Sequence, residues 1–531
     1  MTGKITGQQE ILNLNDHHIK SSLLIARELV RKKVSYLNRI NYYPIPDKDT
    51  GTNLFHTLNA VCSEIQDISD CRIGQIGKKI ISATASGAQG FSGIILAYFF
   101  QGFFQTLTEK KTLTTMEFAR ATDLGCKSAL QAISNPESGT IISVMQDWST
   151  SVSEISAQTE NFKDLLIRSF PEAKKSLAQT KKILPVLKKA GVVDAGAQGF
   201  IYLIEGMVTF LKKGLSKNQF TAGSARIGVK KEETARIEPK YGTSALEKTI
   251  GIVTDSSCDL PADFSRDHHI HIIPLKIIFG DQILLDKIQI SPSEFYNRLV
   301  ESSQHPQTSQ PNLSDVTGIF NKVVPRYDHI LSIHLPRAVS GTLSVIEKAA
   351  EKYRGKITCF DGKSISAGLG LVVMEAASAL DKGHSLEEIK DQIQRSIDNI
   401  KIFIVVPTVK YLVRGGRLSK SKGIVGRVLR LNPIISFDDE GRLIPLANAL
   451  GNRAALKKSF KIAREALQTY ERIKIMVAHA NAPAKARWVS DQLSILFRPK
   501  DEIQIVDAAP ALGVHAGPGT VGFGFIGYHE K

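Results

Sequence analysis

Pro46-Asp47-Lys48-Asp49-Thr50-Gly51-Thr52-Asn53 is the stretch that most constrains the fold and chemistry of this chain. Two carboxylates lie one residue apart, after prolines at 44 and 46 that disfavour a helix. The stretch then leads through small hydroxyl residues and a glycine into an apolar, helix-like segment. Hard cations such as Mg²⁺ prefer oxygen ligands, and a helix N-terminus attracts phosphate. The stretch therefore indicates either a metal-assisted phosphate site or an Asp-Thr-Gly turn that caps a helix.

Length and charge set the first limits on the kind of protein. A chain of 531 residues with 42% hydrophobic and 23% charged residues predicts roughly two to four globular domains. The net charge of +16 favours anionic partners such as nucleotides, membrane surfaces or nucleic acid. Aromatic residues make up only 7%, and there is no zinc-finger, RRM-like or basic-zipper pattern, so we expect no nucleic-acid partner.

The cysteines and the most apolar segments favour a cytoplasmic protein. The N-terminus MTGKITGQQE has no apolar core typical of a secretory signal. The apolar stretch 91–104 is interrupted by glycines and is too short to span a bilayer, so it predicts a buried helix. The cysteines are scattered without CxxC spacing, which predicts reduced thiols. They are Cys62, Cys71, Cys126, Cys258 and Cys359.

Residues 1–213 have the pattern of an all-α domain. Apolar residues recur on one helical face between Ile19 and Leu37. We expect a bundle of about eight helices. The first helix contains the face from Ile19 to Leu37. The other helices are predicted over 53–66, 74–84, 92–108, 115–133, 139–156, 160–181 and 197–213.

The rest of the chain changes character twice. Residues 214–247 are rich in Ser, Gly, Lys and Glu and are typical of a flexible linker. From residue 248 to 531 short β-branched runs alternate with helical patterns, which predicts largely parallel sheets in two subdomains that divide near residue 400. The turn 438–441 lies between two apolar runs and predicts a β-hairpin. Strands are predicted at 250–253, 270–278, 330–335, 357–360, 402–406, 434–437, 473–478 and 503–506.

Three more glycine-rich segments stand at predicted helix starts in the helical half. They are residues 87–93, 137–140 and 194–199. Each alone is explained by a turn or by close helix packing. Together with residues 46–53 they predict one end of a bundle that could enclose a triphosphate and its metal ions.

Four segments, in this order, resemble a known family: NYYPIPDKDTGTNL, GAQGFSGIIL, ESGTII and LPVLKKAGVVDAGAQGF. They are similar to the nucleotide-binding helical domain of the dihydroxyacetone kinase family, most of all to the kinase component of bacterial fatty acid kinase. The resemblance implies an eight-helix barrel that binds ATP and Mg²⁺. It implies that Asp47 and Asp49 are the catalytic metal ligands, with Asn41 near the metals. The nucleotide-binding residues that it implies are Thr50, Thr52, Asn53, Ser92, Gly93, Gly139, Thr140, Asp194 and Gly196.

Two residues depart from that family's pattern. Lys48 stands where the family has glycine, and a lysine at positive φ costs about 1 kcal/mol. Its ammonium group would either repel Mg²⁺ or bind phosphate directly. Phe91 stands where the fatty acid kinases have Asn. Because of these two departures, the alternative of a degenerate kinase domain that no longer turns over ATP stays open.

The α/β half contains two hydroxyl clusters and a histidine beside Gly or Pro. They are Thr308-Ser309-Gln310-Pro311, Ser340-Gly341-Thr342 and His515-Ala516-Gly517-Pro518-Gly519. Hydroxyls and an imidazole can hold a carboxylate by hydrogen bonds. A hydrolytic Ser/His pair is the alternative, but the chain has no G-x-S-x-G elbow and no evident acidic partner for His515.

These clusters, with Thr254-Asp255-Ser256-Ser257-Cys258-Asp259-Leu260-Pro261, resemble the DegV family over about residues 249–529. DegV proteins are the fatty-acid-binding components of fatty acid kinase. The resemblance implies a tunnel between two α/β subdomains, with the fatty-acid carboxylate held by Thr308, Ser340 and His515. It also implies that part of the basic stretch 410–430 contacts the kinase; otherwise that stretch is a solvated surface. The basic residues are Lys410, Arg414, Arg417, Lys420, Lys422, Arg427 and Arg430.

The sequence thus predicts a fatty acid kinase contained in one chain. The C-terminal half would bind a long-chain fatty acid, and the N-terminal half would transfer a phosphoryl group from ATP to give an acyl phosphate for phospholipid synthesis. A transient contact with a membrane or an acyltransferase, and a homodimer, are compatible with this function. The alternatives are a fatty-acid-binding protein with an inactive kinase domain, and a kinase for another small acid or hydroxy-ketone.

Overall fold

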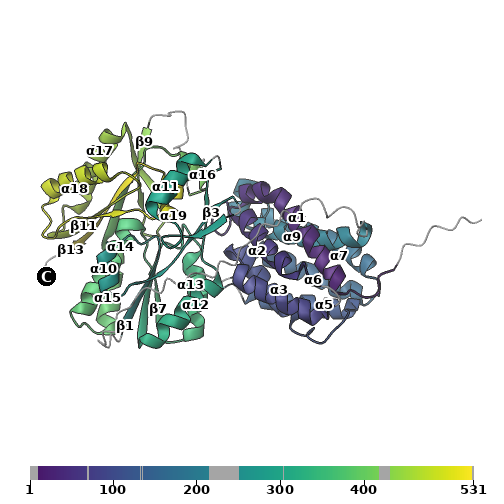
Figure 1. Ribbon diagram of the computed structural model, residues 1–531. Helices are drawn as coiled ribbons and strands as arrows, with labels where there is room; N and C mark the ends of the chain where they lie inside the picture. The colour runs from purple at the N-terminus through teal and green to yellow at the C-terminus, as the bar shows by residue number, and fades with distance from the viewer. Residues whose placement is uncertain are drawn as a thin grey trace, which may run out of the picture.

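The computed structural model describes residues 10–68, 71–131, 133, 136–213, 250–280, 282–302, 304–417 and 431–528. A helical half and an α/β half lie side by side (Figure 1). The predicted linker 214–247 lies outside the described residues, as do Lys420, Lys422, Arg427 and Arg430 of the basic stretch.

Nine helices, one more than predicted, form the described part of residues 10–213. The additional one is the short α8, which begins with Pro185 and is followed by the capping residue Gly191, whose φ is 70°. The helices are α1 (Asp16–Ile40), α2 (Thr50–Ile65), α3 (Ile73–Gly87), α4 (Gly90–Phe104), α5 (Thr115–Leu130), α6 (Ile141–Ser156), α7 (Phe162–Ile183), α8 (Pro185–Ala190) and α9 (Ala195–Lys213).

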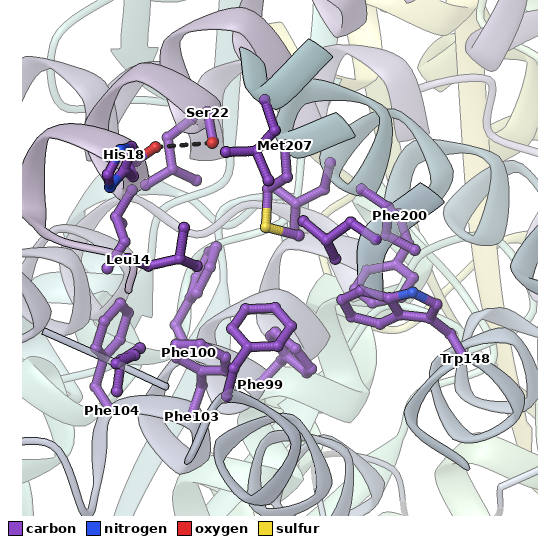
Figure 2. A pocket seen from close by; sticks show the side chains of 18 residues that line it. Leu14, His18, Ser22, Phe99, Phe100, Phe103, Phe104, Trp148, Phe200 and Met207 are labelled. Carbon is purple, nitrogen blue, oxygen red and sulfur yellow. Dashed lines mark hydrogen bonds between the residues drawn. The ribbon is translucent and has the colours of Figure 1, made fainter. Parts of the chain in front are cut away.

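Aromatic packing around α4 forms the centre of the helical half. This is the predicted buried apolar helix, and Phe99, Phe100, Phe103 and Phe104 on it are all buried. They surround an apolar cavity with about 710 Å³ of empty space, which Figure 2 shows with Trp148 and its other lining residues. Across the residues that the structure describes, no helix combines the length and apolarity needed to cross a membrane.

The first sheet of the α/β half is entirely parallel, with strand order β2-β1-β6-β7. Its strands are β1 (Ile250–Asp255), β2 (His271–Ile273), β6 (His329–His334) and β7 (Ile357–Asp361). This sheet has the topology that alternating strands and helices predict.

The second sheet is mostly antiparallel, with order β10-β9-β8-β13-β11-β12, so the prediction of largely parallel sheets is wrong here. Only β11 and β12 pair in parallel. The reason is the unpredicted strand β13, which lies between β8 and β11 and carries three glycines that weaken the strand pattern. The predicted hairpin at 438–441 is confirmed between β9 and β10. The strands are β8 (Ile400–Val405), β9 (Leu431–Phe437), β10 (Leu443–Leu450), β11 (Arg472–His479), β12 (Gln504–Asp507) and β13 (Val521–Tyr528).

A small third sheet, β4-β3-β5, faces the helical half. It consists of β3 (Lys276–Phe279), β4 (Gln282–Leu285) and β5 (Gln307–Ser309), so the single run predicted at 270–278 is split between β2 and β3. The helices of this half are α10 (Ala262–Asp267), α11 (Pro292–Glu301), α12 (Leu313–Val323), α13 (Thr342–Ala350), α14 (Ser366–Asp381), α15 (Leu386–Asn399), α16 (Lys410–Arg414), α17 (Asn452–Leu467), α18 (Pro483–Phe497) and α19 (Pro510–Ala516).

The two halves are joined by an apolar contact as well as by polar ones. Ile94 of α4 is 7% exposed and belongs to the same buried cluster as Val316 and Phe320 of α12 and Ile346 of α13. Burial of such side chains contributes about 1.5–3 kcal/mol each. The helical half therefore packs on the first sheet's helices α12 and α13, and this contact fixes where the N-terminus of α4 lies relative to the α/β half.

Candidate functional site between the two halves

The N-terminus of α2 is held by the end of α1. Asn38 Oδ1 accepts hydrogen bonds from the backbone N–H groups of Gly51 (2.7 Å) and Thr52 (3.2 Å). A Cβ at Gly51 would lie 2.4 Å from the carbonyl oxygen of Val34, so this close approach requires glycine. The Asn53 N–H donates to the Asp49 carbonyl. Protein atoms therefore already accept hydrogen bonds from the N–H groups of residues 51–53.

The side chains of Asp47, Asp49 and Asn41 form an oxygen-rich group before α2. Asn41 Nδ2 donates to Asp47 Oδ1 at 2.6 Å, and Asn41 Oδ1 is buried without a partner. Burial raises the pKa of Asp49 well above its usual range, and the charge of Asp47 and a hydrogen bond with it add to the rise. Two close carboxylates and an unpartnered amide oxygen fit a hard divalent cation, which would relieve their repulsion.

Beside these oxygens lies a pocket with about 340 Å³ of empty space in the helical half. Tyr43, Thr50, Asn53 and Ser92 are among its lining residues. Thr52 does not line it: its hydroxyl accepts from Asn38 Nδ2 and donates to Gln307 Oε1 of the α/β half at 2.7 Å. Of the residues predicted to bind nucleotide in the first motif, Thr50 and Asn53 thus face the pocket and Thr52 does not.

The later glycine segments converge on the same end of the bundle. A Cβ at Gly196 would lie 2.8 Å from Ser92 Oγ, 3.4 Å from Asp194 Oδ1 and 3.6 Å from Cβ of Ile141, so the starts of α4, α6 and α9 meet there. Asp194 accepts from the Ala197 N–H at 2.7 Å, and burial raises its pKa to about 6.

The other three predicted nucleotide residues are placed by local contacts. Thr140 immediately precedes α6 and donates to the Glu137 carbonyl at 2.9 Å. Gly139 has φ 84°, and a Cβ there would lie 2.7 Å from Cβ of Ile183. Gly93 lies against Thr57, whose Oγ1 would be 2.6 Å from a Cβ at that position.

The three residues predicted to hold a carboxylate line one cavity in the α/β half. Thr308 Oγ1 of β5 lies 2.8 Å from His515 Nε2 on α19. Ser340 stands before α13 and shares a hydrogen bond of 2.9 Å with the Thr342 hydroxyl. A Cβ at Gly415 would lie 2.0 Å from His515 Nδ1, so glycine at that position leaves room for the imidazole.

His515 is neutral near pH 7. Burial lowers its pKa well below 6.5, and the nearby positive charges of Arg417 and His305 lower it further. Its Nδ1 atom is buried and has no partner. A neutral imidazole beside the Thr308 hydroxyl can present one hydrogen-bond donor to an anion without a fixed charge.

The aspartates of the helical half line the same cavity as these three residues. The cavity has about 890 Å³ of empty space, part of it open to solvent. Asp47, Asp49 and Arg417 lie at its polar end with Thr308, Ser340 and His515. Away from that end its wall is apolar and comes from the end of β6, the start of α14, and β8, β9 and β10. The apolar residues include Leu335, Ile365, Ile404, Val406, Ile435, Phe437 and Leu443.

Lys48 and Phe91, which depart from the resembling family's pattern, both contact the α/β half. Lys48 has φ 57° and its Nζ donates to the Val413 carbonyl at 3.1 Å. Phe91 Cε2 would lie 2.6 Å from a Cβ at Gly341. Arg417 adds a third contact, since its Nη1 donates to the Asp47 carbonyl at 3.3 Å and its Nη2 lies 3.9 Å from Asp47 Oδ2. The loop 46–49 is thus fixed from both halves.

Sequence reasoning assigned no individual role to three polar residues of this region. They are Asn38, Gln307 and Gln310. Gln310 lines both the cavity of the α/β half and the pocket of the helical half. Its place directly after Thr308-Ser309 was a signal that it lies near the site.

The fold and the site define a protein of two modules. The α/β module contains a cavity that is polar at one end and apolar along its wall, and the helical module closes the polar end of this cavity. The chain belongs to the DegV family, whose model, described as an uncharacterised protein of the DegV family, matches residues 249–527. A DAK2 domain matches residues 44–209. The chain is therefore a DAK2 domain fused to a DegV domain.

Curated relatives and a solved structure agree with this assignment for the α/β half. A DegV domain-containing protein of Clostridium acetobutylicum is 31% identical over 279 residues, which are 52% of this chain and 98% of that protein. One from Clostridium perfringens is 34% identical over 278 residues, 51% of this chain and 96% of that protein. The structure of a fatty-acid-binding DegV family protein from Thermus thermophilus matches with a TM-score of 0.50 and 28% identity, covering 53% of this chain and all of that one.

Proposed function

We propose that this protein is a fatty acid kinase in which the DegV half binds a long-chain fatty acid and the DAK2 half phosphorylates its carboxylate from ATP. The observation that carries this proposal is the shared cavity: Asp47 and Asp49 line it together with Thr308, Ser340 and His515. The similar DegV family protein from Thermus thermophilus binds fatty acid, which supports the choice of ligand.

The apolar wall would hold the acyl chain. Each buried methylene contributes about 0.8 kcal/mol, so a long chain gains roughly 10 kcal/mol before the costs of binding. The carboxylate would then lie at the polar end, where the Ser340 hydroxyl and one member of the hydrogen-bonded pair of Thr308 and neutral His515 can donate hydrogen bonds to it. Because these groups carry no positive charge, they orient the carboxylate without neutralising it, and it keeps its nucleophilicity.

The proposed reaction needs no general base, since a carboxylate is already ionised near pH 7. A carboxylate oxygen forms a bond to the γ-phosphorus of ATP, the bond between that phosphorus and the β–γ bridging oxygen breaks, and ADP keeps the electron pair. Asp47, Asp49 and Asn41 Oδ1 would hold Mg²⁺, which when bound supplies positive charge to the phosphates. The chain itself contributes position: its loop 46–49 brings the metal ligands to the polar end of the acyl cavity. The acyl phosphate would serve phospholipid synthesis.

We further propose that transfer takes place within one chain. Ile94 is buried against the α/β half of the same chain, and Lys48 and Arg417 connect the two halves at the cavity. A tether of 34 residues, 214–247, keeps the halves at an effective concentration of about millimolar when they separate. Separation would let the acyl chain exchange.

The test is direct. Mass spectrometry of the purified protein should find a bound fatty acid, and ADP release should require both oleate and Mg²⁺. Hydroxylamine should trap the product as a hydroxamate, which reports the acyl phosphate itself. Bound lipid without ADP release would favour a fatty-acid-binding protein with an inactive kinase domain. If the protein carries no bound lipid and oleate does not stimulate ADP release, it is a kinase for another acid or hydroxy-ketone.

A further inference from the structure

One buried side chain lies between the two pockets of the site. Gln310 lines the acyl cavity together with Thr308, Ser340 and His515, and it lines the pocket of the helical half together with Thr50 and Ser92. It is 7% exposed. In the described part of the structure, three residues line both pockets: Asp47, Asp49 and Gln310. Gln310 is the uncharged one of the three.

The amide nitrogen of Gln310 has no hydrogen-bond partner. Gln310 Nε2 is buried and unpaired, although it carries two N–H donors. A buried donor without an acceptor is destabilising, so such a group in a folded protein calls for an explanation. The packing fixes the side chain: a Cβ at Gly341 would lie 2.0 Å from Gln310 Oε1 and 2.6 Å from Phe91 Cε2. The amide is therefore held between the halves by its neighbours while its donors stay unused.

The surroundings of the Gln310 amide limit which ligand group can accept hydrogen bonds from it. An acceptor must enter from one of the two pockets. In the proposed function, the Thr308 hydroxyl, His515 and the Ser340 hydroxyl hold the fatty-acid carboxylate, and Asp47 and Asp49 hold the metal ion. The ligand group that has to pass between the pockets is a phosphoryl group. At neutral pH its ionised oxygens accept hydrogen bonds and do not donate them.

We propose that Gln310 is a catalytic residue that donates a hydrogen bond to the phosphoryl group as it moves from the nucleotide to the carboxylate. This inference rests on the proposed kinase function and deepens it. The step is the transfer described above: the new bond joins a carboxylate oxygen to phosphorus, ADP leaves with the electron pair, and no proton is transferred. Gln310 N–H stabilises an equatorial phosphoryl oxygen during this passage and does not change its own bonds. Being neutral, it does so without adding a charge that would retain the acyl phosphate.

The experiment compares Gln310→Met and Gln310→Glu with the wild type, using the full-length chain, oleate, ATP and Mg²⁺. Both variants keep most of the side chain and lack the N–H donors. We expect kcat to fall by about 10²-fold, the usual effect of removing one such donor, with KM for ATP and the Kd for oleate within about threefold of wild type. The matched control is Gln394→Met, because Gln394 is exposed on α15 and makes its hydrogen bond to Asp398.

A second readout separates a catalytic from a merely structural role. ADP with aluminium fluoride mimics the transferred phosphoryl group, and its affinity in the presence of oleate should fall in both Gln310 variants while ADP alone binds as before. Unchanged kcat in a variant that folds and binds oleate would overturn the assignment. So would a loss confined to oleate affinity, since Gln310 would then serve the ground-state carboxylate. If the wild type itself forms no hydroxamate, the proposed function fails first, and aluminium fluoride binding would not depend on oleate.

Discussion

The hydroxyl of Ser309 donates a hydrogen bond of 3.1 Å to Oδ1 of Asn53, although the two residues are 256 positions apart. Asn53 lies in the first turn of α2, four residues after Asp49, and Ser309 follows Thr308 directly. A parallel contact joins the Thr52 hydroxyl to Gln307 at 2.7 Å. These two bonds connect the strand that carries a predicted carboxylate ligand to the helix that follows the predicted metal ligands. They explain why both groups line one cavity.

Asp49→Asn should abolish phosphoryl transfer and spare fatty-acid binding. A metal ion at phosphate supplies several kcal/mol of transition-state stabilisation, so losing one of its carboxylates should lower kcat by about 10³-fold. ADP release with oleate measures the loss, and fluorescence displacement of a fatty-acid probe measures binding. The matched control is Asp491→Asn on the exposed surface of α18. ADP release at the wild-type rate in Asp49→Asn would contradict the metal assignment.

Thr308→Val and His515→Ala should each weaken fatty-acid binding. A hydrogen bond to a charged group contributes about 1.5–3 kcal/mol, which corresponds to roughly 10–100-fold in Kd. Because Thr308 Oγ1 and His515 Nε2 are 2.8 Å apart, the two losses should not add in the double variant. Isothermal titration with oleate provides the four affinities, and ATP affinity serves as the control that should not change. Additive losses would mean that the two side chains act on the ligand independently.

The sequence predicted much of this site because its residues cluster in short motifs. Thr308, Ser340 and His515 each stand beside Gly or Pro, and the structure brings all three to one cavity. The acidic loop was also recognisable before a helix, and Asp49 does precede α2. Helices with strong apolar periodicity, such as α1 and α7, were placed to within a few residues.

What could not be predicted depends on contacts between distant segments. Asn38 takes up the N–H groups of Gly51 and Thr52 only because α1 and α2 approach closely, which no local pattern reveals. The strand β13 determines the antiparallel order of the second sheet, yet its glycines weaken the strand signal. Lys48 and Phe91 stood out as departures from a pattern, but their role became visible only when both were found to contact the other half.

Ile94→Ala should loosen the contact between the halves. Shortening a buried isoleucine costs about 2–5 kcal/mol when the cavity left behind cannot collapse. We therefore expect a larger radius of gyration in small-angle X-ray scattering and a kcat lowered by about tenfold or more, with oleate affinity unchanged. Ile495→Ala is the matched control because Ile495 is 68% exposed. If kcat and radius both stayed at the wild-type values, this apolar contact would have no part in bringing the two sites together.

Transfer within one chain can be tested by mixing two inactive variants. One chain carries Asp49→Asn, and the other carries Thr308→Val together with His515→Ala. If each DAK2 half serves its own DegV half, the mixture should show no more ADP release than the sum of its parts. Wild-type protein diluted over the same range should keep a constant activity per chain. Recovery of activity in the mixture would show that the intact halves of different chains can work together.

Asp286→Asn should stabilise the protein more at pH 8 than at pH 5. Asp286 is fully buried beside β4; its Oδ2 accepts from the Ser256 hydroxyl at 2.7 Å, and its Oδ1 has no partner. Burial raises its pKa from 3.8 to about 7, against the opposing effect of the Lys287 charge. Between these two values the folded chain binds more protons than the unfolded chain, so the free energy of unfolding falls as the pH rises. Above about pH 7 the carboxylate is ionised in both states and the loss is complete.

Asparagine resembles the protonated carboxyl group and does not titrate, so the variant escapes this loss. The gain in the free energy of unfolding of Asp286→Asn over wild type should grow by about 2–3 kcal/mol between pH 5 and pH 8. Urea unfolding curves at the two pH values measure this gain. Subtracting the free energy of unfolding of the wild type from that of the variant at each pH removes the contribution of the histidines that both proteins contain. Asp491→Asn, at an exposed position, should show no such trend. A constant difference between the two pH values would mean that Asp286 is ionised in the folded protein already at pH 5, and that Lys287 compensates its burial.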